Sequence, residues 1–141
     1  MKLVVDELGY GLKESVYQSA LAVDLRSQGH KVDLEVNKSI LYKDHNIGTV
    51  RLDMIIDDNY IIEFKALAKL TKKEFTQLLQ YMKISGIKNG CIINVNTDSM
   101  QVLPAAQLLY FTSSYHDGVL FFVIVGVHLV IVGVHLVFLC K

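Results

Sequence analysis

The sequence predicts one α/β domain of the α+β kind, with its elements in the order helix, three strands, helix, strand. Three observations support this. Apolar residues recur at helical spacing over residues 12–29 and 72–84, apolar and polar residues alternate over 32–42, and strand-like runs occupy 50–56, 60–67 and 91–95. A chain of 141 residues has room for one such domain and not for two.

The charge balance restricts the classes of partner. The chain has 14 Lys and Arg against 14 Asp and Glu, which counts against tight, non-specific nucleic-acid binding. It leaves room for an enzyme that contacts a few phosphates. With Cys91 in an apolar run and no signal peptide at the N-terminus, we expect a reduced, cytoplasmic compartment.

The first helix is expected over residues 12–29, with Gly29 as its end. An acid, Glu14, lies at its start and shares a side of the helix with Tyr17, from which it can point inward. The alternative is an acid favoured by the helix dipole. The apolar stripe expected to face the core consists of Leu12, Val16, Ala20 and Val23, widened by Leu21 and Leu25.

The centre of the chain reads as a hairpin. Residues 50–56 and 60–67 are strand-like, and residues 57–59 form a turn in which Asn59 takes the left-handed conformation. A loop of three residues sets Ile56 opposite Tyr60 and therefore Asp53 opposite Glu63.

Two facing carboxylates repel each other unless a positive charge lies between them. A divalent cation such as Mg²⁺ suits the pair, and Lys65, on the same face as Glu63, can hold a water or a phosphate oxygen. The alternative is a solvated charged face, in which Arg51 pairs with Glu63 and Asp53 with Lys65.

The second helix is expected over residues 72–84, with Thr71 as N-cap and Glu74 completing a capping box. Gln77 and Tyr81 share one of its faces, where they are either ordinary boundary residues or part of a site. Three lysines cluster at its start, as a phosphate-steering patch or simply a soluble surface: Lys69, Lys72 and Lys73.

These motifs resemble those of the PD-(D/E)XK nuclease superfamily. Asp53 followed by Glu63-Phe64-Lys65 is similar to its catalytic signature, and Gln77 and Tyr81 are similar to the QxxxY helix of RecB-like exonuclease domains. The segment from Gly11 to Tyr17 resembles the motif of the prokaryotic GxxExxY family. The resemblance implies a nuclease-like core with a central mixed sheet flanked by helices.

It also implies a metal-dependent nuclease that hydrolyses phosphodiester bonds, with DNA ahead of RNA as substrate. The metal, Mg²⁺ or Mn²⁺, would be held by Glu14, Asp53, Glu63 and the Phe64 carbonyl. Asp53, Glu63 and Lys65 would be catalytic, and Gln77, Tyr81 and Tyr17 would position substrate. A homodimer is a further option. The rival functions are a catalytically silent binding or scaffold module and a membrane-tethered accessory protein.

The C-terminal third has a different composition. We expect the domain to cover 1–97, a connector 98–118 and an apolar tail 119–141, in which the sequence Val-Ile-Val-Gly-Val-His-Leu occurs twice in tandem. As a helix, residues 119–140 would span about 33 Å, enough for membrane contact through Val119–Cys140. Extra strands, a buried segment or a non-native read-through are equally open readings.

Overall fold

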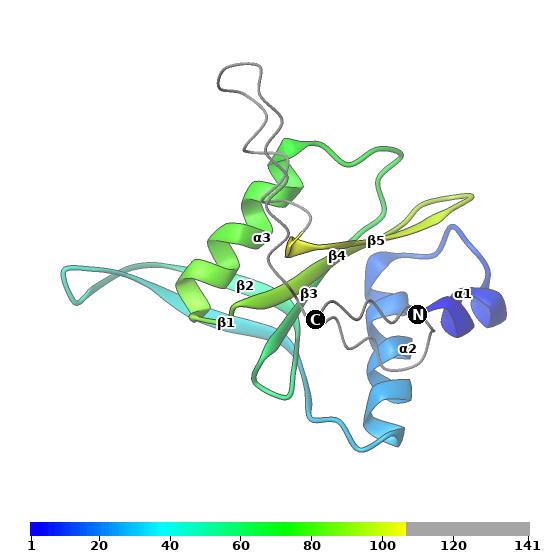
Figure 1. The fold of residues 1–141 in the computed structure, drawn as a ribbon, viewed down its shortest axis with the longest axis horizontal. Coiled ribbons are helices and arrows are strands. Elements are labelled where there is room, and N and C mark those ends of the chain that lie inside the picture. Colours follow the sequence, from blue (N-terminus) through cyan, green and yellow to red (C-terminus); the bar gives the residue numbers. More distant parts are fainter. Residues whose placement is uncertain (107–141) are drawn as a thin grey trace, which may run out of the picture.

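The computed structural model describes residues 1–106, which form one five-stranded sheet with helices on both faces (Figure 1). The strands lie in sequence order, β3 and β4 are parallel, and the other neighbours are antiparallel. The elements are α1 (Lys2–Leu8), α2 (Glu14–Ser27), β1 (Val32–Tyr42), β2 (His45–Ile56), β3 (Tyr60–Lys65), α3 (Lys72–Ser85), β4 (Asn89–Val95) and β5 (Met100–Pro104).

The predicted fold class is confirmed, and the six expected elements are all present, although β2 begins at His45, five residues before its expected start. Two elements are additional. The chain begins with the short helix α1, and the strand β5 pairs with β4 inside the segment 98–118 that was expected to be a connector. The predictions for the apolar tail concern residues outside the described part of the chain. Within residues 1–106, no helix has the length and apolar character needed to cross a bilayer.

The central strand β3 separates two hydrophobic cores. Ile62 and Phe64 pack with α1 and α2, whereas Ile61 packs with α3. Side chains alternate between the two faces of a strand, so Glu63 and Lys65 project on the face that α3 covers. This agrees with the parallel partner of Glu63 on β4, Ile92, which belongs to the α3 core.

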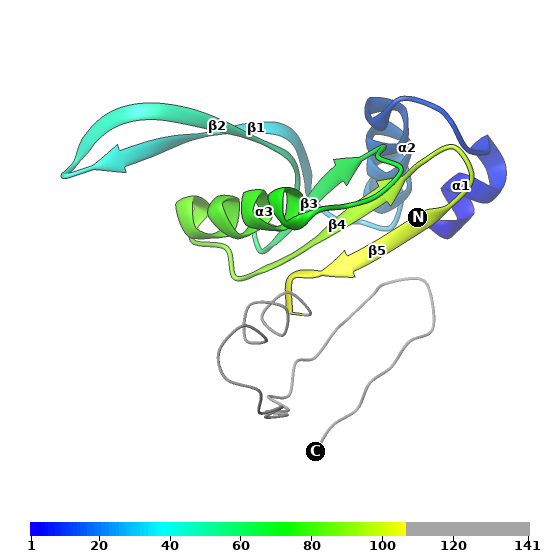
Figure 2. The same ribbon diagram turned by 90° about the horizontal axis from the view of Figure 1, so that it is seen from above.

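The strands β1 and β2 bend at the same level, and on the two sides of the bend their paired side chains pack in different cores. Leu34 and Met54, which are partners, pack in the α2 core, but the next partners, Val36 and Leu52, pack in the α3 core. The residue between them on β1 is Glu35, whose φ of 50° lies in the left-handed region. A residue with that conformation breaks the alternation of faces, and the strand bends. Beyond the bend, the hairpin extends past α3 (Figure 2).

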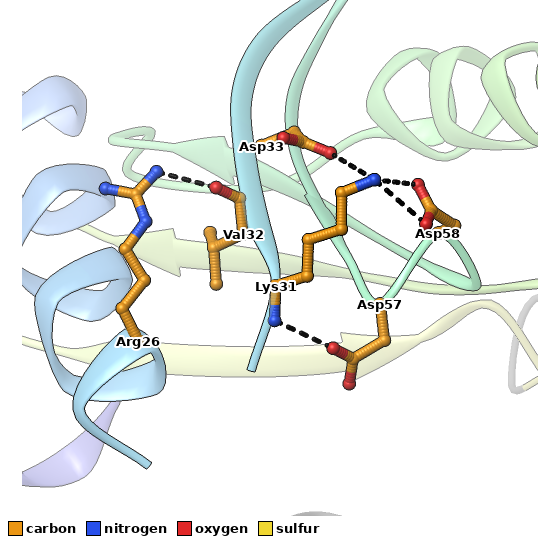
Figure 3. A network of polar contacts seen from close by, with 6 residues as sticks. All are labelled: Arg26, Lys31, Val32, Asp33, Asp57 and Asp58. Carbon is orange, nitrogen blue, oxygen red and sulfur yellow. Dashed lines mark hydrogen bonds and ion pairs between the residues drawn. The ribbon is translucent and has the colours of Figure 1, made fainter. Parts of the chain in front are cut away.

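The turn between β2 and β3 has the predicted length and a different conformation. Ile56 pairs with Tyr60, as expected for a loop of three residues. However, the left-handed residues are Asp57 and Asp58, and the prediction for Asn59 was wrong. Their carboxylates explain why the turn tolerates this conformation. Asp57 accepts a hydrogen bond from the backbone N–H of Lys31, and Asp58 binds the Lys31 ammonium at 2.8 Å (Figure 3).

The orientation of α2 differs from the expected one. The helix ends at Ser27 with Gln28 as its C-cap, and the predicted stop residue, Gly29, follows with φ of 89°. Its buried residues are Tyr17, Gln18, Leu21 and Ala22, whereas Val16 and Val23 of the predicted stripe are exposed. The sequence contains two apolar stripes on this helix, and contact with the sheet selects the one led by Tyr17.

Candidate metal and catalytic site

The backbone pairing of β2 with β3 stops just before the predicted acidic pair. The last partners are Met54 and Ile62, so Asp53 has no paired residue on β3, and its expected place directly opposite Glu63 is not observed. Because the bend carries β2 away, the N–H of Phe64 has no strand partner there. The Asp53 carboxylate takes that place and accepts a hydrogen bond from Phe64 N through Oδ2 at 2.8 Å.

The N-terminus of α2 brings a second carboxylate to the same edge of β3. Glu14 Oε1 accepts a hydrogen bond from the N–H of Ala66 at 2.6 Å. N–H groups two residues apart on an extended strand point to the same side. Asp53 and Glu14 therefore line one edge of β3, and strand geometry directs the Phe64 carbonyl to that edge as well.

A residue that the sequence analysis missed fixes this arrangement from α2. The side-chain N–H of Gln18 donates to the backbone carbonyl of Asp53, and Gln18 is buried. It lies one helical turn after Glu14 on the same side, so it could have been found by following that side instead of the purely apolar stripe.

The third carboxylate is the most buried. Glu63 is 2% exposed, and its Oε1 accepts a hydrogen bond from the Lys65 ammonium at 2.7 Å. Burial, followed by the nearby charge of Asp53, raises the pKa of Glu63 to about 7, although Lys65 opposes the shift. Burial also raises the pKa of Asp53. For Lys65, burial alone would lower the pKa, but the bond to Glu63 and the surrounding carboxylates outweigh it and raise the pKa.

Whether these residues suit a divalent cation depends on the carboxylate oxygens that accept no hydrogen bond from the protein. Oε2 of Glu63 is buried and has no hydrogen-bond partner. Among residues 1–106, the second oxygens of Asp53 and Glu14 also accept no hydrogen bond. An all-oxygen set of acidic ligands suits Mg²⁺ or Mn²⁺ in its chemistry. As the side chains lie, however, the described residues contain no group of three His, Cys, Asp or Glu close enough to enclose an ion.

Two buried polar side chains hold the loops beside the acids. Asn94 on β4 binds both the N–H and the carbonyl of Leu67, just beyond the strand that carries Glu63 and Lys65. Tyr17 is 1% exposed, and its hydroxyl donates to the Gly9 carbonyl and accepts from the N–H of Leu12. Tyr17 thus lies in the core and holds the turn before Glu14, instead of at the surface expected of a residue that contacts substrate.

The remaining predicted residues gather along α3. Gln77 donates a hydrogen bond to the Tyr81 hydroxyl at 2.7 Å, so the two side chains act as one unit. They line a shallow depression between α3 and β2, but no hydrogen bond joins either of them to the acids within residues 1–106. Lys72 and Lys73 line this depression. Lys69 is exposed on the loop before α3. The complete lining is Val50, Lys72, Lys73, Thr76, Gln77, Gln80 and Tyr81.

Comparisons with known proteins agree with this fold. The solved structure titled "Crystal structure of SSO0001" has 16% sequence identity and a TM-score of 0.53, with 70% of this chain and 55% of that chain covered. At this identity the likeness concerns the fold alone, and this chain matches only about half of that protein. No curated protein matched.

The match at the level of families is broader. A family model described as the PD-(D/E)XK nuclease superfamily matches residues 1–103, which include the bend in β2, the three acids and Lys65. Members of that superfamily are typically nucleases, which generally use divalent metal ions and act on nucleic acid. This chain belongs to the PD-(D/E)XK nuclease superfamily.

Proposed function

We propose that this protein is a divalent-metal-dependent nuclease that hydrolyses phosphodiester bonds, with DNA ahead of RNA as its substrate. The observation that carries the proposal is the buried Glu63 carboxylate, whose Oε2 has no partner. A buried acceptor without a partner is costly, and such atoms are rare in folded proteins. Here it lies close enough to Asp53 and Glu14 for their charges to raise its pKa. A cation bound at this point would remove both costs.

Each residue then has a distinct role. Glu14, Asp53, Glu63 and the Phe64 carbonyl would hold Mg²⁺ or Mn²⁺, which when bound would neutralise phosphate charge and activate a water molecule. The Lys65 ammonium, which donates to Glu63 in the structure, would also donate to the attacking water or to a phosphate oxygen. Water would add to phosphorus as the bond to the leaving oxygen breaks. Gln77 and Tyr81 would position substrate as one hydrogen-bonded unit, with Lys69, Lys72 and Lys73 attracting its phosphates.

We also propose the narrower assignment to the GxxExxY family and a cytoplasmic location. Three observations on the residues of that motif support the family assignment. Gly11 has φ of 86°, a conformation that favours glycine, Glu14 reaches the edge of β3, and Tyr17 holds the intervening turn.

A second function is supported by the same site. Lys65 neutralises part of the buried charge, and each carboxylate accepts a hydrogen bond from the protein itself. A catalytically silent module that binds nucleic acid would keep this arrangement.

Cleavage assays separate the two functions. Labelled single-stranded and duplex DNA and RNA should be cut with Mg²⁺ or Mn²⁺ and left intact in EDTA, and Asp53→Asn should abolish cutting. If wild type cuts none of these substrates with either metal, while it binds one of them, the nuclease proposal fails and the binding module replaces it.

A further inference from the structure

The outer part of the β1–β2 hairpin, residues 36–51, extends beyond the rest of the sheet, and we call it the arm. Of its residues, only Val36 and Val50, at its base, pack against a hydrophobic core. Near its tip, Leu41 is 64% exposed, Tyr42 60% and Ile47 65%. Both views show it extending away from the sheet and past α3 (Figures 1 and 2). Beyond its base this ribbon buries little apolar surface, and its exposed apolar side chains favour a binding partner.

The charge of the arm favours a polyanion as that partner. It contains three cationic residues, Lys38, Lys43 and Arg51, against one acid, Asp44, in a chain whose net charge is zero. Arg51 is paired with Glu35 at 3.6 Å, just outside the arm, so Lys38 and Lys43 carry its excess charge. The Lys43 ammonium lies 5.5 Å from the centre of the Tyr42 ring, so the tip presents a cation and an aromatic ring together.

The shape of the arm favours a groove. Its strands pair from Val36 with Leu52 to Tyr42 with His45, and the turn has only two residues, Lys43 and Asp44, both with positive φ. The tip is therefore narrow. A two-stranded β-ribbon of this kind fits the major groove of duplex DNA. One side of the ribbon is exposed and carries hydrogen-bonding side chains in cross-strand pairs: Asn37 with Arg51, and Ser39 with Thr49.

We propose that the arm binds duplex DNA beside the site of cleavage, an inference that rests on the proposed nuclease function. Asp53 lies on β2 just beyond the base of the arm, and Asp44, in the turn at the tip, precedes it by nine residues. At about 3.3 Å per residue the tip lies about 30 Å from the acids. One turn of duplex DNA is about 34 Å long. The tip would therefore contact the duplex almost one helical turn away from the phosphate that is cleaved at Asp53 and Glu63.

The test measures binding without cleavage. The full-length protein in EDTA is titrated into a labelled 30-base-pair duplex, an 8-base-pair duplex and a 30-nucleotide single strand, and affinity is read by fluorescence anisotropy at several salt concentrations. The tip variant combines Tyr42→Ala with Lys43→Gln. Its matched control, Leu3→Ala with Lys2→Gln, removes an exposed apolar residue and a lysine from α1 instead.

We expect the tip variant to bind the 30-base-pair duplex about tenfold more weakly, with a salt slope reduced by about one. The control should bind like wild type. On the 8-base-pair duplex, which is too short to reach from the acids to the tip, wild type and the tip variant should be indistinguishable.

Three results would overturn the inference. They are no binding of the long duplex by wild type, equal binding by wild type and the tip variant, and an equal loss on all three ligands. If light scattering shows that the tip variant dissociates a dimer while duplex affinity is unchanged, the arm is a contact between copies of this chain instead. Because cleavage is not measured, a protein that cuts nothing but needs the tip for duplex binding would keep this inference and lose the nuclease proposal.

Discussion

Glu63 and Lys65 lie two residues apart on β3 and share a hydrogen bond of 2.7 Å, in which the Lys65 ammonium donates to Glu63 Oε1. The other oxygen of the same buried carboxylate has no partner. Lys65 is thus a counter-ion bound to one oxygen of the carboxylate, while the charges of Asp53 and Glu14 act on the same group and raise its pKa. The bond to Lys65, the Oε2 atom without a partner and the cation proposed to bind there are the basis of the first three predictions.

Asp53→Asn should separate chemistry from stability. The amide oxygen of Asn can still accept the hydrogen bond from Phe64 N, while one negative charge beside Glu63 disappears. We expect metal-dependent cleavage to be lost and the melting temperature in EDTA to stay equal or rise. Asp98→Asn, in an exposed loop, is the control and should change neither. A fall in the EDTA melting temperature would show that Asp53 stabilises the fold through ion pairs.

The metal-free protein should lose stability as the pH rises towards neutrality. Glu63 has a folded pKa of about 7 against 4.5 when unperturbed, so between these values the folded state binds more protons than the unfolded state. The free energy of unfolding therefore falls from about pH 4.5 to about pH 7, by up to about 3 kcal/mol, and then levels.

Glu63→Gln provides the comparison, because the amide cannot titrate and its oxygen can still accept from Lys65. Urea denaturation in EDTA at pH 5, 6, 7 and 8 should give a sloping difference between wild type and variant. A difference that stays constant with pH would mean that Glu63 is ionised throughout this range.

Lys65→Ala should harm the metal-free protein more at high pH than at low pH. Without Lys65, the buried Glu63 carboxylate has no counter-ion, and removing one partner of a buried pair costs roughly 3 kcal/mol when the other stays charged. At pH 6 Glu63 can accept a proton, so the cost should be smaller.

The increase in melting temperature of Lys65→Ala on adding Mn²⁺ should survive, whereas the rate of cleavage should fall. Lys88→Ala, an exposed lysine, serves as control, and loss of the Mn²⁺ shift would mean that Lys65 is needed for metal binding.

The bend at Glu35 should tolerate glycine and resist a β-branched residue. Glu35 has φ of 50°, and its exposed ion pair with Arg51, at 3.6 Å, contributes little. Glu35→Gly should leave stability within about 1 kcal/mol of wild type, and Glu35→Val should lower it by about 1–3 kcal/mol. Since the bend delivers Asp53, the valine variant should also lose metal-dependent cleavage. Equal stability of the two variants, measured by urea denaturation, would contradict a left-handed Glu35.

The start of α3 offers a test of local stability. The Thr71 side chain accepts from Lys73 N, and Glu74 reaches back to the N–H of Thr71, which completes the capping box. Thr71→Ala should cost about 1 kcal/mol in the free energy of unfolding. Thr76→Ala, in the exposed part of the same helix, should cost less than about 0.5 kcal/mol. A similar cost for both would indicate that the cap contributes nothing specific.

The sequence by itself determined where six of the eight elements lie and which residues could carry chemistry. Residues 32–42 alternate in hydrophobicity, Thr71 and Glu74 specify a capping box, and Gly29 and Gly86 adopt the positive φ that ends helices. These are local effects, because each depends on neighbours within one or two turns of chain. The three-residue loop likewise fixed the pairing of Ile56 with Tyr60.

Only the tertiary structure decided how those residues meet. The helix α2 carries two apolar stripes, and contact with the sheet buried Tyr17 and left Val23 exposed. The bend at Glu35 contains no glycine, so the sequence did not predict it. Beside this bend the pairing of β2 with β3 ends, and Asp53 accepts a hydrogen bond from Phe64 N instead of pairing with Glu63 across the strands. Such outcomes depend on non-local packing and on the satisfaction of buried polar groups, which local propensity does not determine.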